Sequence, residues 1–329
     1  MKDTFVYKIA SFIWRKTFIK CRECYRDRKY REYWEEHRIC EGNRNPDKTF
    51  YVVRRREVYI GLFSYYMTNV CQVAKALENG YIPVIDLQNS ANMYLKPEQI
   101  GKVNAWEYYF EQPCGYSLGD IKGSKNIILG GGYWREYGMF PYNDINYLMD
   151  RDGEIAKYRE IARKYFRFNG TVQQKIDAEW KQFERKKVLG VLCRGTDYTS
   201  NRPHGHCIQP SLQEMFVKVE DVLQTYGCDS IFLGTEDKLI YDEFKEKYGD
   251  MVFTNRKKFI EYHGEGSIGK LVTCNVEDAY EEGLEYLVTI ALLSKCDCFV
   301  GGHTSGTVGV MLMEESFEYC YIFDLGLYE

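Results

Sequence analysis

The chain has 329 residues, a length that suggests two domains rather than one. Hydrophobic residues make up 45% and charged residues 28%, a composition typical of soluble globular proteins. The formal net charge is −4, which argues against nucleic acid as a partner of the whole protein. Twelve cysteines without a visible secretory signal favour reduced thiols in a cytoplasmic protein.

The N-terminal segment, residues 1–48, is basic on an otherwise acidic protein. Residues 1–40 contain 11 lysines and arginines against 6 acidic residues. We expect a helix throughout residues 3–38, with an apolar stripe bordered by lysines and arginines. Such a helix could lie on an anionic membrane surface or pack on the body of the protein, and the sequence leaves both open.

Cysteine and histidine spacing in this segment raises the question of a metal. Cys21 and Cys24, with His37 and Cys40, have the spacing of zinc ligands. In one continuous helix the two pairs would lie ~20 Å apart and could not share an ion. We therefore expect no metal and no cofactor.

Residues 49–150 have the pattern of one small α/β domain. Strands are expected at 49–53 and 81–87, with a helix at 67–80 between them, which gives a β-α-β unit. A further strand at 125–132 ends in three glycines.

Residues 151–187 are highly charged and are expected to form linking helices. Residues 188–329 alternate strands and helices, as in a doubly wound sheet of Rossmann type. Two such domains would leave a cleft between them. In the second domain the strands are expected at 187–193, 229–235, 251–254, 297–302 and 319–325, with helices between them.

Polar clusters follow three of these strands. Because ligands bind at the carboxyl ends of strands in such sheets, the three clusters are the candidate site. They are Arg194-Gly195-Thr196-Asp197, then Thr235-Glu236-Asp237, and finally the run from Gly301 to Thr307 that opens a helix.

The third cluster is suited to bind a phosphate. Its glycines let a ligand approach the backbone, and the helix start offers free N–H groups and a positive dipole end. An ordinary Ser/Thr N-cap is the alternative. The run has neither dinucleotide nor P-loop spacing, which counts against oxidoreductases and P-loop NTPases. The residues expected to bind the donor here are His303, Thr304, Ser305, Gly306 and Thr307.

The other two clusters add charge of both signs. Arg194 can bind phosphate oxygens in a bidentate manner, or it can form a salt bridge with Asp197 or another neighbour. Glu236 and Asp237 can accept hydrogen bonds from a base or a ribose, although one of them is expected to cap the next helix. With Thr196 and Thr235 beside them, these residues predict a pocket for a nucleoside diphosphate.

Four segments of this half, which make up three ordered motifs, resemble the donor-binding half of α-1,6-fucosyltransferases, within the superfamily that also contains α-1,2- and protein O-fucosyltransferases. They are "GVLCRGTDY", "GHCIQPSLQEM", "IFLGTEDKLIYDEFKEKYG" and "EYLVTIALLSKCDCFVGGHTSG", within residues 186–315. The resemblance implies a GT-B architecture of two Rossmann-like domains with a cleft between them. It also implies inverting transfer from GDP-fucose without a metal. In it Arg194 holds the β-phosphate, Asp237 recognises guanine and Ser305 lies in the motif that cradles the diphosphate.

The sequence departs from the family pattern at three positions. Leu192 stands where the family commonly has a histidine that contacts guanine, and Gly195 stands where it often has a second arginine. Arg202 replaces a glutamate proposed as the catalytic base. The remaining candidates for the base are Asp197, His204 and His206. Tyr133, Trp134 and Arg135, in the glycine-rich stretch 130–138, are expected to bind the acceptor sugar.

The resulting hypothesis is a glycosyltransferase that acts on a glycan or lipid-linked glycan of the bacterial surface-polysaccharide type. Residues 1–38 would provide a peripheral contact with the inner face of the membrane. A non-catalytic protein that binds a nucleotide sugar or a glycan is the alternative, and Arg202 favours it. A nucleotide-sugar epimerase is a third possibility.

Overall fold

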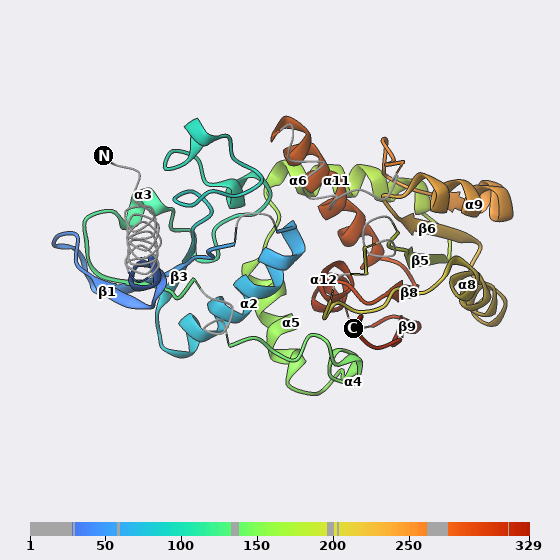
Figure 1. Ribbon diagram of the computed structural model, residues 1–329, viewed down its shortest axis with the longest axis horizontal. Coiled ribbons are helices and arrows are strands. Elements are labelled where there is room, and N and C mark those ends of the chain that lie inside the picture. Colours follow the sequence, from blue (N-terminus) through green and yellow to red (C-terminus); the bar gives the residue numbers. More distant parts are fainter. Residues whose placement is uncertain are drawn as a thin grey trace, which may run out of the picture.

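The computed structural model describes residues 28, 30–57, 60–132, 138–195, 201–202, 204–261, 276–314 and 316–329. These residues form a mixed α/β structure with two sheets, one at each end of the molecule in Figure 1. The strand order is β1-β4-β2-β3 in the first sheet and β7-β6-β5-β8-β9 in the second. Helices α2, α5, α6, α11 and α12 lie between the two sheets.

The first sheet confirms the expected β-α-β unit. β2 (Arg44–Val53) pairs in parallel with β3 (Ile82–Ile85), and α2 (Leu62–Glu78) connects them. β4 (Ser124–Leu129) pairs with the other side of β2, also in parallel. Short helices fill the rest of this half and were not predicted from the sequence. They are η1 (Pro97–Gln99), η2 (Ala105–Tyr108) and α3 (Leu118–Ile121).

The prediction of a helix throughout residues 3–38 is wrong at its C-terminal end. β1 (His37–Ile39) is a strand that pairs antiparallel with β4, with His37 opposite Leu129. Ile39 packs against the apolar cluster on the outer face of this sheet, and this long-range contact outweighs local helix propensity. Residues 1–27, which include Cys21 and Cys24, lie outside the described residues.

The second sheet is parallel throughout, as expected. Its strands are β5 (Val188–Leu192), β6 (Ser230–Gly234), β7 (Val252–Phe253), β8 (Cys298–Gly302) and β9 (Tyr319–Phe323). The helices that follow the strands are α8 (Leu212–Tyr226), α9 (Lys238–Tyr248), α11 (Val276–Leu293) and α12 (Ser305–Met313), and η5 (Gly249–Met251) lies between α9 and β7. Leu192 is opposite Gly234 on one side and Gly301 on the other. The three predicted polar clusters therefore follow neighbouring strands at one edge.

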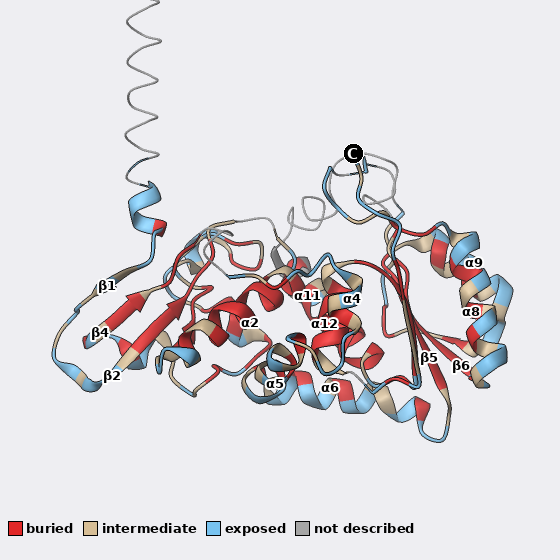
Figure 2. Cartoon of the chain, turned by 90° about the horizontal axis from the view of Figure 1, so that it is seen from below, coloured by how far each residue is buried: buried red, intermediate tan, exposed pale blue. Residues whose placement is uncertain are grey.

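Alternate side chains along β5 and β6 point to opposite faces of the second sheet. Leu192 and Phe232 point into a large apolar cluster that also contains Val53 of the first sheet. Leu189 and Val191 point the other way, into the cluster beneath α8 and α9. Since alternate residues share a face, Arg194 continues the face of Leu192, towards the first sheet. Figure 2 shows buried residues continuing through the helices between the sheets.

The helices expected within 151–187 are present. They are α5 (Ile155–Tyr165) and α6 (Gly170–Trp180), followed by η4 (Lys181–Phe183) and preceded by α4 (Ile145–Met149). No described helix is long and apolar enough to cross a membrane.

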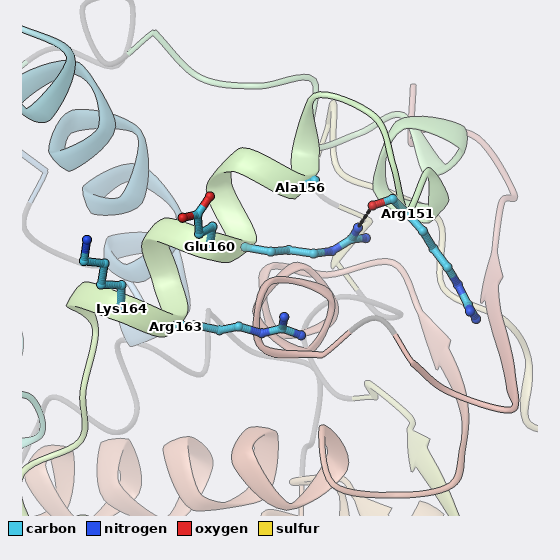
Figure 3. A pocket seen from close by; sticks show the side chains of 6 residues that line it. Arg151, Ala156, Glu160, Arg163 and Lys164 are labelled. Carbon is cyan, nitrogen blue, oxygen red and sulfur yellow. Dashed lines mark hydrogen bonds between the residues drawn. The ribbon is translucent and has the colours of Figure 1, made fainter.

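Arginines of α5 and the preceding turn fasten α12 to the middle of the molecule. Arg159 is buried and donates to four carbonyls, which include Met311 O at 2.8 Å and Leu148 O at 2.6 Å. Arg163 donates to Met313 O, and Arg151 donates to Phe317 O. Figure 3 shows Arg151 and Arg163 around a small cavity of about 320 Å³. Arg159 and Arg163 each donate to a carbonyl at the C-terminal end of α12, and the remaining carbonyls belong to α4, to the turn after it and to Phe317, so the role of these arginines is structural.

Candidate functional site

A cavity of about 550 Å³ opens at the carboxyl edge of the second sheet. Its walls come from both parts of the chain. The first part contributes residues of the α2 start, Met93, Tyr94, Tyr142 and Asn143. The second contributes Leu192, Arg194, Thr235, Glu236, Arg256, His303, Thr304 and Ser305, among others. This volume is in the range of small-molecule sites.

Residues of the predicted phosphate site line this cavity. Arg194 follows β5, and Thr304 and Ser305 follow the neighbouring strand β8. Thr304 caps α12 in a capping box with Thr307, and Ser305 is the first residue of the helix. A fixed cation and a helix N-terminus therefore line one cavity, as the sequence predicted.

Arg194 forms an ion pair with Glu236, at 3.3 Å between Nε and Oε1. The Arg194 side chain is 21% exposed and that of Glu236 is 9% exposed. The alternative of a salt bridge with a neighbour is thus realised, and the partner comes from the second cluster. Because Arg194 lines the cavity, the pairing is compatible with a further contact to a ligand.

Asp237 has a structural role. Its carboxylate accepts hydrogen bonds from Leu239 N at 2.9 Å and from Ile240 N at 3.5 Å, so it is the N-cap of α9. It is not among the described residues that line the cavity. Its assignment to guanine recognition stays a prediction.

Two further donor-site candidates are not among the described residues that line the cavity. The hydroxyl of Thr307 donates to Gly302 O, within the turn that opens α12. Gly306 packs so tightly against Tyr286 that an added Cβ would lie 2.1 Å from the tyrosine oxygen. Their direct contact with a donor also stays a prediction.

His303 is a buried histidine in the cavity wall, with 4% of its surface exposed. Its Nε2 lies 2.7 Å from Tyr142 O. A carbonyl can only accept, so Nε2 carries the proton and donates. Burial is the main cause that lowers the pKa of His303 below its ordinary value. The imidazole is therefore neutral at pH 7, and it links the two walls of the cavity.

Of the candidate bases, His204 and His206 are both exposed, and only His206 is among the described residues that line the cavity. The C-terminal strand-like segment holds this loop. Gly205 N donates to Tyr328 O at 2.9 Å, and Tyr328 N donates to His206 O at 2.9 Å. An antiparallel bridge joins Cys207 to Leu327 between these bonds. We call this C-terminal segment, residues 326–329, the strap. Sequence reasoning missed it because its hydrogen bonds join two segments that are far apart in the chain.

Five predicted residues lie outside the described residues: Thr196, Asp197, Tyr133, Trp134 and Arg135. Conversely, the sequence analysis missed Arg256, Glu282 and Tyr286, which line the cavity. Arg256 had a usable signal, because it follows a strand just as Arg194 does.

No family model matches the chain, and no curated protein matches it. Among solved structures, fucosyltransferase NodZ from Bradyrhizobium is 17% identical, with a TM-score of 0.52 over 81% of this chain and 94% of that one. NodZ α-1,6-fucosyltransferase co-crystallized with GDP gives the same identity and TM-score over 81% and 93%. POFUT1 in complex with GDP is 13% identical over 84% and 99% of the chains, with a TM-score of 0.48. The chain therefore shares the fold of the NodZ fucosyltransferase structures, a likeness that the order of its motifs had predicted.

Proposed function

We propose that this protein is an inverting, metal-independent glycosyltransferase of GT-B architecture that transfers fucose from GDP-fucose to a hydroxyl of a glycan. The observation that carries the proposal is the convergence of Arg194, Thr304 and Ser305 on one cavity. A structure of the same fold was co-crystallized with GDP, which supports the donor.

The diphosphate is placed between Arg194 and the first turn of α12. There the guanidinium and the N–H groups of the helix N-terminus stabilise the negative charge that develops on the leaving group. Glu236 holds the Nε edge of Arg194, so the guanidinium has a defined orientation before the donor binds.

The transfer is a single displacement. The acceptor oxygen forms a bond to C1 of fucose, while the bond from C1 to the β-phosphate oxygen breaks and its electron pair leaves with GDP. The hydroxyl proton passes to a base. His206 is the described candidate that lines the cavity, and Asp197, three residues after Arg194 in the sequence, remains a candidate.

The acceptor approaches from the wall formed by the first part of the chain, past Tyr142 and Asn143. Aromatic side chains there suit sugar rings. We extend the proposal to a lipid-linked glycan, with the basic residues 1–38 on an anionic membrane surface.

A nucleotide-sugar panel tests the donor assignment. GDP and GDP-fucose are expected to raise the melting temperature, and Arg194→Ala is expected to abolish that shift. Incubation with GDP-fucose is expected to release GDP slowly, even without an acceptor. Stabilisation by UDP or dTDP species alone would refute the donor assignment.

A non-catalytic binder is the second candidate, because Arg202 occupies the position at which the resemblance places a base. GDP binding with neither hydrolysis nor transfer, across a panel of glycan acceptors, would favour this candidate.

A further inference from the structure

Arg256 is a cavity-lining arginine to which the proposed function gives no role. Its side chain is 5% exposed, and it follows the edge strand β7. Nε donates to Lys258 O at 2.6 Å, and Nη2 pairs with the carboxylate of Glu282. Nη1 forms no hydrogen bond with the described residues, although it carries two donors. Because Arg256 lines the cavity, these donors are available to a ligand bound there.

The place of Arg256 along the sheet edge indicates which part of a ligand it meets. In strand order the edge presents the α12 start after β8, Arg194 after β5, Glu236 after β6 and Arg256 after β7. Neighbouring strands are about 4.8 Å apart, so the ends of β5 and β7 are separated by about 10 Å. This spacing is comparable with the span from phosphate to base in a nucleoside diphosphate.

The charges along the edge favour the same orientation. Glu282 offsets the charge of Arg256, whereas Arg194 has the positive end of α12 beside it as well as Glu236. An anion is therefore drawn to the Arg194 end. The Arg256 end suits a neutral group with hydrogen-bond acceptors. Thr289 lines the wall there, and its hydroxyl bonds Asn255 Oδ1 at 2.8 Å.

We infer that Arg256 recognises the nucleobase of the donor through a pair of acceptors, the O6 and N7 atoms of a 6-oxopurine. Arginine forms a bidentate contact with these two atoms of guanine. Adenine presents an amino donor at position 6, and uracil has no counterpart of N7. The inference rests on the proposed function, because it assumes that the cavity holds a nucleoside diphosphate. Arg256 would supply a contact to the base that Leu192 cannot make, because Leu192 lines the same cavity with an apolar side chain.

Isothermal titration of GDP, IDP, ADP and UDP tests the inference in three variants. They are Arg256→Gln, Arg256→Lys and the exposed neighbour control Lys257→Gln. In the unaltered protein and in the control, the affinities for GDP and IDP are expected to differ by no more than about threefold. Both are expected to bind ADP and UDP about tenfold or more weakly. Arg256→Gln is expected to lose most of that preference, and Arg256→Lys to retain part of it.

Arg256→Gln alone leaves the Glu282 carboxylate without its partner and could destabilise the fold. The double variant Arg256→Gln/Glu282→Gln removes both charges of the pair and so serves as the folded counterpart. A GDP-to-ADP ratio that is unchanged in both folded Gln variants overturns the inference. So does IDP binding more than tenfold weaker than GDP, because the 2-amino group would then carry the selectivity. A protein that binds none of the four nucleotides overturns the proposed function itself. Preference for ADP or UDP overturns the assignment of Arg256 and the GDP donor of the proposed function together, whereas an unchanged preference for GDP in the folded Gln variants overturns the inference alone.

Discussion

Gly195 marks a place where the backbone at the end of β5 approaches the start of α9. A Cβ added there would lie 2.3 Å from Asp237 Oδ2 and 2.7 Å from Ile240 Cδ1. Asp237 is not free to move away, because its carboxylate caps two N–H groups of α9. We predict that Gly195→Ala destabilises the protein by about 1–3 kcal/mol through overpacking.

A double-mutant cycle separates this clash from a general effect of the substitution. Asp237→Ala alone is expected to cost about 1 kcal/mol, the loss of an N-cap. In that background the carboxylate 2.3 Å from the added Cβ is absent and Ile240 Cδ1 is a movable chain end, so only the Cβ of residue 237, at 2.9 Å, remains as a close neighbour. The double variant is therefore expected to be more stable than the sum of the two single effects predicts, by about 1 kcal/mol.

Urea unfolding followed by tryptophan fluorescence measures all four members of the cycle. Gly170→Ala is the matched control, because nothing lies within 4 Å of a Cβ there and the residue begins a helix. The control is expected to be neutral or slightly stabilising. Equal costs of Gly195→Ala in the two backgrounds would refute the predicted contact between this turn and the α9 cap.

Three further predictions concern other parts of the molecule. Burial lowers the pKa of His303, so the unfolded chain takes up a proton at this histidine at a higher pH than the folded protein does. The free energy of unfolding should therefore be highest above about pH 6.5 and should fall as the pH drops below that value. In urea unfolding between pH 5 and 8, His303→Gln should reduce this dependence of stability on pH. A slope that is unchanged in that variant would contradict the assignment. Deletion of residues 326–329 removes the hydrogen bonds to Gly205, His206 and Ile208, so we expect faster proteolysis near Arg202 and loss of transfer, with GDP affinity kept within about threefold. Unchanged proteolysis would show that the strap does not order this loop. Arg159→Leu leaves four carbonyls without their donor, so it should lower the free energy of unfolding by about 3 kcal/mol or more. The side chain of Arg163 is 45% exposed, so Arg163→Leu should lower it by less than about 1 kcal/mol. Similar losses of stability in the two variants would contradict the proposed role of Arg159 at the end of α12.

The second sheet could be predicted almost entirely from the sequence. Each of its strands is a short apolar run between a turn and an amphipathic helix, and such local patterns are sufficient to identify strands. The polar clusters at the strand ends were predictable for the same reason. Arg194 needed only the rule that carboxyl ends of parallel strands share an edge.

Features that depend on distant pairing could not be predicted. β1 has its partner in β4, about 90 residues away, and its local sequence continues the pattern of a charged helix. The strap on the His206 loop and the Arg256–Glu282 pair depend equally on long-range contacts. Asp237 shows a further limit, because its sequence position fits both ligand recognition and a helix cap, and geometry identifies the cap.

A crystal structure of the protein with GDP tests the central claim most directly. The claim is that neighbouring strand ends bind one diphosphate between Arg194 and the N-terminus of α12. Phosphate oxygens are expected within hydrogen-bond distance of both the Arg194 guanidinium and the backbone N–H groups at Ser305 and Gly306. A diphosphate bound elsewhere, for example in the cavity between Arg151 and Arg163, would contradict it.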